Sequence, residues 1–142
     1  MPTKKRASRA RSREKSSLRK RSFLVVDDDE SFTGVVRHWA KGRGAKVEVA
    51  RHGVEALERL RQETYDALIV DLKMPEMDGY ELHLRLAVER PDVLRRAVFV
   101  TGDFVNPEAR EFIDHSSCPC LQKPFEMDEL EKAILRVLPE AS

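Results

Sequence analysis

Residues 65–79 of this 142-residue chain read YDALIVDLKMPEMDG. The apolar run from Ala67 to Val70 is typical of a strand that is buried on both faces of a parallel sheet. It ends in a carboxylate, Asp71, and turn-forming proline, aspartate and glycine follow within the same stretch. Open α/β sheets bind their ligands at the carboxyl ends of their strands, so Asp71 is a candidate functional residue. Taken alone, the position is equally consistent with a solvated carboxylate at a strand end.

The same combination of a short strand-like run and a following helical repeat recurs along the chain. Strands are predicted at residues 23–26, 45–49, 67–70, 97–100 and 118–123. Helices are predicted to follow them, around residues 32–39, 54–60, 80–89, 107–113 and 127–138. Five strands that alternate with five helices predict an α/β fold, in which helices cover both faces of a parallel sheet.

The order of the strands follows from which of them resemble edge strands. Residues 45–49 alternate between apolar and polar side chains, and Pro119 cannot donate a hydrogen bond to a neighbouring strand. The second and fifth strands are therefore expected at the edges, with the other three between them. With right-handed crossovers, the strand order 2-1-3-4-5 of flavodoxin-like folds satisfies this condition. The first and third strands are then neighbours.

The composition excludes several classes of protein. Hydrophobic residues make up 41% and charged residues 36% of the chain, as in a soluble globular domain with a charged surface. No apolar run is long enough for a membrane span, and no apolar segment of a secretory signal follows the basic N-terminus. Cys118 and Cys120 are too close to staple the fold and lack a second cysteine pair for zinc. We expect reduced thiols and a cytoplasmic protein without a membrane partner.

The first 22 residues differ from the rest of the chain. They contain ten lysines and arginines and one acidic residue, a net charge of +9, whereas the remainder carries −8. With Leu18 as the one large apolar residue, a disordered basic tail is predicted at residues 1–22, ahead of a folded domain at residues 23–139. Such a tail could contact nucleic acid, an anionic membrane or an acidic protein. Because it has no aromatic residue to stack on bases, the favoured interpretation is a solubilising extension or leftover sequence from an upstream start, and nucleic-acid binding is disfavoured.

In the predicted strand order, acidic side chains meet at one edge of the sheet. Asp27 and Asp28 follow the first strand and lie beside Asp71, which ends the third. Three carboxylates repel one another unless they share a cation or a proton. A small set of hard oxygen ligands suits Mg²⁺, which also binds water and phosphate. The fourth and fifth strands add a hydroxyl at Thr101 and an ammonium at Lys123. Phosphoryl transfer onto the carboxylate of Asp71 is the chemistry that fits this set.

Four short motifs, in this order and spacing, resemble the receiver (phosphoacceptor) domain of bacterial two-component response regulators. They are FLVVDD at residues 23–28, VDLKMPEMDG at residues 70–79, VTG at residues 100–102 and KPF at residues 123–125. The resemblance covers roughly residues 22–139, all but the basic tail. It implies the receiver fold, Mg²⁺ as the cofactor and phosphorelay signalling as the function.

The resemblance assigns roles to the positions around the metal. It implies that Asp71 is the phosphorylated residue and that Asp28 is a direct Mg²⁺ ligand, with Asp27 binding largely through metal-bound water. Lys73 is expected to offer its backbone carbonyl, because its side chain has the wrong charge for a ligand. The neighbouring acids are expected to cap helices or to lie in loops: Asp29, Glu30 and Asp78.

Around the phosphoryl group, the resemblance implies that Thr101 forms a hydrogen bond to it and that Lys123 pairs with its oxygens. Gly102 and Asp103 flank the site. The bond between Lys123 and Pro124 is a candidate cis peptide, because proline lowers the cost of that isomer.

Two features concern this chain in particular. Receivers often carry Tyr or Phe three residues before the lysine, but here Cys120 holds that place. A rotating aromatic side chain at this position is therefore not expected to be the output switch.

Lys73 and Asp103 flank the phosphorylation site with opposite charges. We hypothesise that these two side chains pair across the site and impede the hydrolytic water.

The resemblance implies a histidine kinase or a phosphotransfer protein as the phosphoryl donor, and an output protein that the sequence does not identify. Because the chain ends at Ser142, a stand-alone receiver is expected, unless the chain is a fragment of a longer protein. It would act through protein contacts, onward phosphotransfer or a homodimer formed by the fourth and fifth helices. Self-phosphorylation and self-hydrolysis would be its intrinsic activities, so it is not expected to be a conventional enzyme. A hydrolase would need a general acid or base near Asp71, and the four histidines lie within or beside predicted helices. The remaining alternatives are a phosphorylation-independent interaction module and nucleic-acid binding through the tail.

Overall fold

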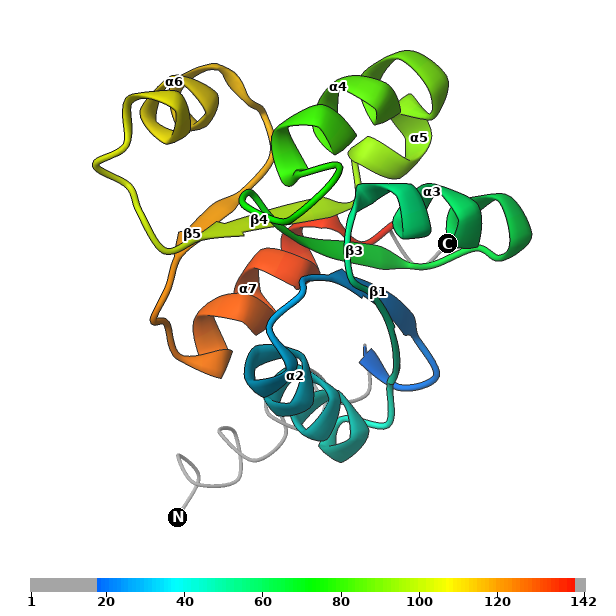
Figure 1. Ribbon diagram of the computed structural model, residues 1–142. Coiled ribbons are helices and arrows are strands. Elements are labelled where there is room, and N and C mark those ends of the chain that lie inside the picture. The colour runs from blue at the N-terminus through cyan, green and yellow to red at the C-terminus, as the bar shows by residue number, and fades with distance from the viewer. Residues whose placement is uncertain (1–17, 140–142) are drawn as a thin grey trace.

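The computed structural model describes residues 18–139, and a five-stranded parallel sheet forms its centre (Figure 1). The strand order is β2-β1-β3-β4-β5, which confirms the predicted order. The two strands predicted at the edges, the second and the fifth, lie at the edges. The strands are β1 (Ser22–Val26), β2 (Lys46–Ala50), β3 (Ala67–Asp71), β4 (Ala97–Thr101) and β5 (Cys120–Gln122).

Six helices accompany these strands within the described residues, one more than predicted. The additional helix, α5, is a single turn of four residues that begins with a proline. Four residues are too few to show a helical repeat in a sequence, although proline favours the first turn of a helix. The helices are α2 (Glu30–Gly42), α3 (Gly53–Gln62), α4 (Gly79–Glu89), α5 (Pro91–Leu94), α6 (Pro107–His115) and α7 (Met127–Val137).

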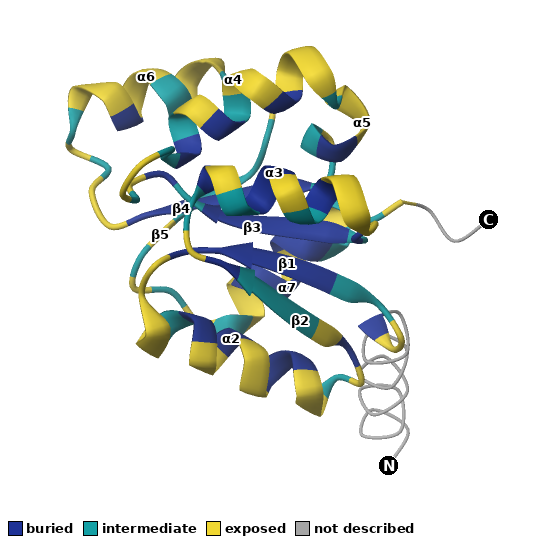
Figure 2. Ribbon diagram, turned by 45° about the vertical axis from the view of Figure 1, so that its right-hand side comes forward, coloured by how far each residue is buried: buried dark blue, intermediate teal, exposed yellow. Residues whose placement is uncertain are grey.

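The helices divide between the two faces of the sheet. Side chains of α3, α4, α5 and α6 share a core with Leu24 and Val26 of β1, whereas those of α2 and α7 pack with Phe23 and Val25. Consecutive side chains of a strand point to opposite faces, so β1 contributes to both cores. Figure 2 shows the central strands buried and the outer faces of the helices exposed. This burial on both faces explains why the central strands are continuous apolar runs in the sequence.

Side chains that follow the strands cap four of the described helices. His52 caps α3, where its Nδ1 accepts a hydrogen bond from the backbone amide of Glu55 at 3.3 Å. Asp29 accepts hydrogen bonds from two backbone amides in the first turn of α2, at 3.0 and 3.4 Å. Asp78 accepts one at the start of α4, at 3.0 Å, and Asn106 accepts two at the start of α6, at 2.9 and 3.3 Å. The capping role expected of Asp29 and Asp78 is confirmed. These caps satisfy amides that a helix leaves unpaired, and they fix the loops at the carboxyl edge of the sheet.

The described fold includes residues that the composition had assigned to the tail. Leu18 is fully buried against the core formed by α2 and α7, and Ser22 is the first residue of β1. The backbone amide of Lys20 also donates to the carbonyl of Gly44 at 2.8 Å. Residues 18–22 therefore belong with the sheet, because burial of Leu18 stabilises a segment whose charges can stay in water. The rest of the predicted tail, residues 1–17, lies outside the described residues. None of the described helices is long and apolar enough to cross a membrane.

Candidate functional site at the carboxyl edge of the sheet

The residues predicted to form a site meet at the carboxyl edge of the sheet. Asp27 follows β1, Asp71 ends β3, Thr101 ends β4 and Lys123 follows β5. They converge because parallel strands end at the same edge. Asp27, Asp28 and Asp71 each offer one carboxylate oxygen, and these three oxygens lie within 4.8 Å of one another. The predicted proximity of the three acids is confirmed.

The carboxylate of Asp71 lies in an unfavourable place for a negative charge. Burial and the nearby charge of Asp27 raise the pKa of Asp71 to about 6, although the ammonium of Lys123 favours its charged form. The Lys123 nitrogen lies 3.5 Å from one Asp71 oxygen, and the backbone amide of Lys73 donates to the other at 3.2 Å. The Asp71 side chain is 14% exposed. The carboxylate is therefore half-buried and can be reached from solvent.

Lys123 is bonded more closely to Asp27 than to Asp71. Its Nζ donates to Oδ2 of Asp27 at 2.8 Å. Burial acts to lower the pKa of Lys123, but the hydrogen bond to Asp27 and the charge of Asp71 outweigh it, and the pKa is raised. The lysine is therefore charged at neutral pH. It partly neutralises the acidic group of the site.

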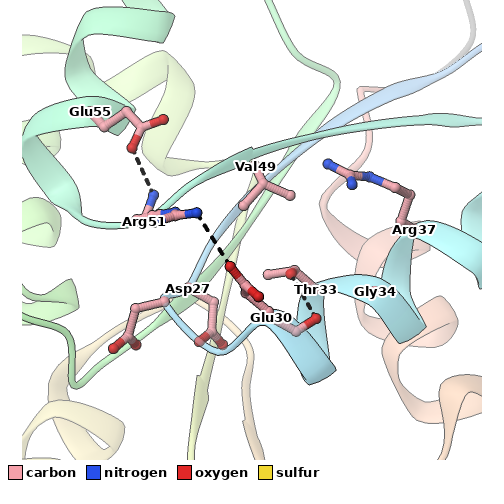
Figure 3. Close-up of a pocket in the computed structure, with 9 residues that line it drawn as sticks. Asp27, Glu30, Thr33, Gly34, Arg37, Val49, Arg51 and Glu55 are labelled. Carbon is pink, nitrogen blue, oxygen red and sulfur yellow. Dashed lines mark hydrogen bonds and ion pairs between the residues drawn. The ribbon is translucent and has the colours of Figure 1, made fainter.

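The two acids that follow β1 have different environments. Asp27 is 1% exposed, and its second oxygen, Oδ1, accepts a hydrogen bond from the backbone amide of Asp29 at 2.9 Å. Asp28 is exposed. Both line a cavity of about 390 Å³ between α2, β2 and the start of α3, and at its rim Arg51 pairs with Glu30 at 3.3 Å (Figure 3). Of the two acids, only Asp28 is therefore open to solvent.

The end of β4 provides a buried hydroxyl. Thr101 is 2% exposed, and its hydroxyl oxygen accepts a hydrogen bond from the backbone amide of Asp103 at 3.2 Å. The hydroxyl acts as the acceptor in this bond, so its own hydrogen can be donated to another group. The carbonyl of Thr101 accepts from the backbone amide of Lys123 at 2.8 Å, which joins the ends of β4 and β5. Gly102 faces open space, with no atom within 4 Å of an added β-carbon.

The loop after Asp71 returns closely over the end of β3. The amide of Gly79 donates to the carbonyl of Leu72 at 3.0 Å. A β-carbon added to Gly79 would lie 2.4 Å from the backbone oxygen of Asp71 and 2.8 Å from the α-carbon of Leu72. Only glycine permits this approach. The position explains why a glycine follows the turn in the motif at residues 70–79.

Residues 23–135 match the family described as the response regulator receiver domain. The chain belongs to this family. It is 30% identical over 116 residues to the transcriptional regulatory protein ZraR of Klebsiella oxytoca, and 37% identical over 117 residues to the response regulator MprA of Mycobacterium ulcerans. The alignments cover 82% and 80% of this chain, but 26% and 50% of those two relatives. The chain therefore spans half or less of their length.

A solved structure supports the same family. The chemotaxis response regulator CheY4 of Vibrio cholerae is 30% identical to this chain, with a TM-score of 0.71. The superposition covers 84% of this chain and 99% of CheY4. The receiver domain described here thus shares its five-stranded parallel architecture with a response regulator of known structure.

In this receiver domain a small side chain stands at the position expected for an aromatic residue. Cys120 is a free, half-buried thiol, and burial together with the thiol of Cys118 raises its pKa to about 11. Cys120 is the register partner of Phe99 on β4. The ring of Phe112 on α6 packs against Phe99 and against His83 of α4, with both centroid distances at 4.9 Å. An aromatic cluster therefore anchors α6 beside the cysteine.

The ion pair hypothesised between Lys73 and Asp103 does not hold in this structure. Within residues 18–139, no salt bridge joins these two side chains. The carboxylate of Asp103 instead accepts hydrogen bonds from the backbone amides of Val105 and Asn106, both at 3.1 Å. Both amides bind the same oxygen, Oδ1, so this carboxylate is held by the backbone of its own loop. The peptide bond before Pro124 is cis, as expected.

One residue of the site was not predicted. The ring centroid of Phe32, in the first turn of α2, lies 4.0 Å from the Lys123 ammonium nitrogen. The helical repeat assigned this ring only to the apolar side of the helix. The available signal was its place four residues after Asp28, in the helix that begins at the carboxyl edge of the sheet.

Proposed function

We propose that Asp71 accepts a phosphoryl group, and that a histidine kinase or a phosphotransfer protein supplies it from a phosphohistidine. The observation that carries the proposal is the setting of this carboxylate, 3.5 Å from the Lys123 ammonium and beside two further acids at the carboxyl edge of the sheet. Membership of the receiver domain family supports it. A nucleophile next to charges that can bind phosphoryl oxygens is the arrangement that phosphoryl transfer needs.

In the proposed reaction, a carboxylate oxygen of Asp71 attacks the phosphorus atom. An oxygen–phosphorus bond forms, the phosphorus–nitrogen bond of the phosphohistidine breaks, and the leaving imidazole keeps that electron pair and takes up a proton. In the second step a water oxygen attacks the phosphorus and loses a proton to solvent, and the bond between the phosphorus and the Asp71 oxygen breaks. Inorganic phosphate leaves, and the carboxylate of Asp71 is regenerated. In this scheme the domain removes its own phosphoryl group and returns to the unphosphorylated state without a separate phosphatase.

We propose Mg²⁺ as the cofactor of this site. Asp27, Asp28 and Asp71 provide three hard oxygen ligands within 4.8 Å of one another. Burial and repulsion from Asp27 raise the pKa of Asp71, and a bound cation would offset both. The exposure of Asp28 leaves room for water ligands. The resemblance to receivers assigns the backbone carbonyl of Lys73 as a further ligand. When bound, the metal supplies positive charge for the phosphoryl oxygens.

Thr101 and Lys123 are proposed to bind the phosphoryl group. The Thr101 hydroxyl has a hydrogen to donate, and the lysine already contacts Asp71. Thr101 ends β4 and Lys123 follows β5, and both of these strands lie on the same side of β3 in the sheet. The two residues therefore approach Asp71 from the same side. A donor and a cation placed in advance stabilise charge on the transferring group. Gly102 and Asp103 are proposed to flank the group without binding it.

The phosphorylated domain is proposed to act through protein contacts. These are onward transfer, the binding of an output protein, or a homodimer formed through α6 and α7, the fourth and fifth helices of the sequence prediction. The chain spans half or less of ZraR and MprA, so the effector activities of those proteins are not carried over to it. A cytoplasmic location stays a prediction.

Intact mass spectrometry tests the phosphoryl acceptor. The purified protein would be incubated with acetyl phosphate, with Mg²⁺ or with EDTA, for the wild type, Asp71→Asn and Asp114→Asn. Asp114 is an exposed aspartate of α6 and serves as the matched control. We expect one added phosphoryl group in the wild type and the control, dependent on Mg²⁺, and none in Asp71→Asn. Modification of Asp71→Asn, or no modification of a folded wild type, would contradict the proposal.

A further inference from the structure

The ammonium group of Lys123 lies against two carboxylates and an aromatic ring. Its nitrogen is 2.8 Å from an Asp27 oxygen, 3.5 Å from an Asp71 oxygen and 4.0 Å from the centroid of the Phe32 ring. A cation within about 6 Å of an aromatic centroid is attracted by the negative face of the ring. The lysine side chain is 22% exposed, so the contact is largely shielded from water. Shielding strengthens such an attraction.

The ring of Phe32 is held in place by its own helix and by the segment after β5. Its backbone amide donates to the Asp29 cap at 3.4 Å, which fixes the first turn of α2. Its ring meets the ring of Phe125 edge to face, with centroids 5.9 Å apart and planes at 79°. It also packs against the core formed by α2 and α7. The short segment after β5 therefore contacts the ring through two of its residues, Lys123 and Phe125.

We propose that Phe32 is a positioning residue for Lys123 in the phosphoryl transfer proposed above. The charge of Asp71 changes when a phosphoryl group is attached. The attraction between Asp27 and Lys123 would weaken when a cation binds beside Asp27. The face of the Phe32 ring attracts the ammonium in every one of these states. It therefore keeps the lysine directed into the site while its carboxylate partners change. The inference rests on the proposed function, because the positioned group is the one that would bind the phosphoryl oxygens.

The competing interpretation is that Phe32 is only an apolar wall. Three variants separate the two. Phe32→Leu keeps an apolar side chain but removes the aromatic face, whereas Phe32→Trp keeps an aromatic face that attracts cations more strongly. Val35→Ala is the matched control. Val35 lies on the same helix, lines an apolar groove together with Phe32 and Lys123, and is 53% exposed. Circular dichroism shows whether each variant is folded.

The first measurement reports the contact without any phosphorylation. The ε-methylene protons of Lys123 would be assigned by NMR in the wild type and the three variants, without Mg²⁺. An aromatic face shifts such protons upfield. We expect the upfield shift in the wild type, Phe32→Trp and Val35→Ala, and its loss in Phe32→Leu.

The second measurement is the initial rate of phosphorylation of Asp71 by acetyl phosphate with Mg²⁺. We expect Phe32→Leu to react ~3- to 30-fold more slowly, the range that corresponds to loss of a shielded cation–π contact. Phe32→Trp and Val35→Ala are expected to keep the wild-type rate. Retention by the tryptophan variant is the result that a role in packing alone does not produce.

Each outcome decides a different claim. If the Lys123 signals are the same in the wild type and Phe32→Leu, there is no contact, and the inference is wrong while the phosphoryl acceptor stands. If the signals differ but folded Phe32→Leu reacts at the wild-type rate, or Phe32→Trp is as slow as Phe32→Leu, Phe32 does not position the lysine. If the wild type itself takes up no phosphoryl group, the proposed function fails and the positioning role fails with it.

Discussion

Replacing the carboxylate of Asp71 by an amide is expected to stabilise the domain at neutral pH when no divalent cation is present. The folded protein raises the pKa of this group from 3.8 to about 6, mainly by burial and by the charge of Asp27. Between these two values the unfolded chain has lost its proton while the folded protein retains it. The free energy of unfolding therefore falls as pH rises from about 4 to about 6, and the full penalty applies above that range.

The size of the effect follows from the shift. About two pKa units correspond to about 3 kcal/mol, and the shift already includes the attraction from Lys123 that Asp71→Asn also removes. The side chain is 14% exposed, and water in the site reduces the penalty. We expect Asp71→Asn to raise the free energy of unfolding by about 1–3 kcal/mol at pH 7.5, and by about a third of that at pH 4.5.

Urea unfolding in EDTA at both pH values measures this difference. Trp39 is the one tryptophan of the chain and is 8% exposed, so its fluorescence follows unfolding. Asp114→Asn, which replaces an exposed aspartate on α6, is the control and should leave stability unchanged at both pH values. A gain of equal size at pH 7.5 and pH 4.5, or a loss at pH 7.5, would refute the electrostatic reasoning.

Three further predictions concern the same edge of the sheet. Mg²⁺ at one hundred times its dissociation constant should stabilise the wild type by about 2.7 kcal/mol in thermal unfolding. Asp28→Asn should need a much higher Mg²⁺ concentration for the same stabilisation. Equal responses of the two proteins would exclude Asp28 as a ligand. Lys123→Met leaves the buried carboxylate of Asp27 without its cation, so the free energy of unfolding in urea without Mg²⁺ should fall by about 3–5 kcal/mol. Mg²⁺ should restore part of this loss. Unchanged stability would contradict the pairing of Lys123 with Asp27. Gly79→Ala places a β-carbon 2.4 Å from a backbone oxygen at the end of β3 and should cost about 1–3 kcal/mol. Gly34→Ala lies inside α2 with no atom within 4 Å of the new carbon, so it should instead raise the free energy of unfolding by about 0.5–1 kcal/mol. If both alanine variants changed stability in the same direction, the close approach of Gly79 to the end of β3 would be wrong.

Much of the site could be predicted because it depends on chain order rather than on packing detail. Asp27, Asp71, Thr101 and Lys123 each follow or end a strand, and parallel strands share one carboxyl edge. The order of the strands then brought the acids together within 4.8 Å, as expected. The one-turn helix α5 was not predicted, because four residues carry no helical repeat.

Local periodicity and turn chemistry by themselves determined the five parallel strands, their order and the edge at which chemistry is placed. The tertiary structure alone decided which side chains touch there. It paired Lys123 more closely with Asp27 than with Asp71, laid the ring of Phe32 against the lysine and turned Asp103 to its own loop amides. Phe32 and Lys123 are distant in sequence, and their contact depends on how α2 packs beside the segment after β5. A sequence repeat places a residue on a face of its own element, but packing between elements and rotamers determine its partner.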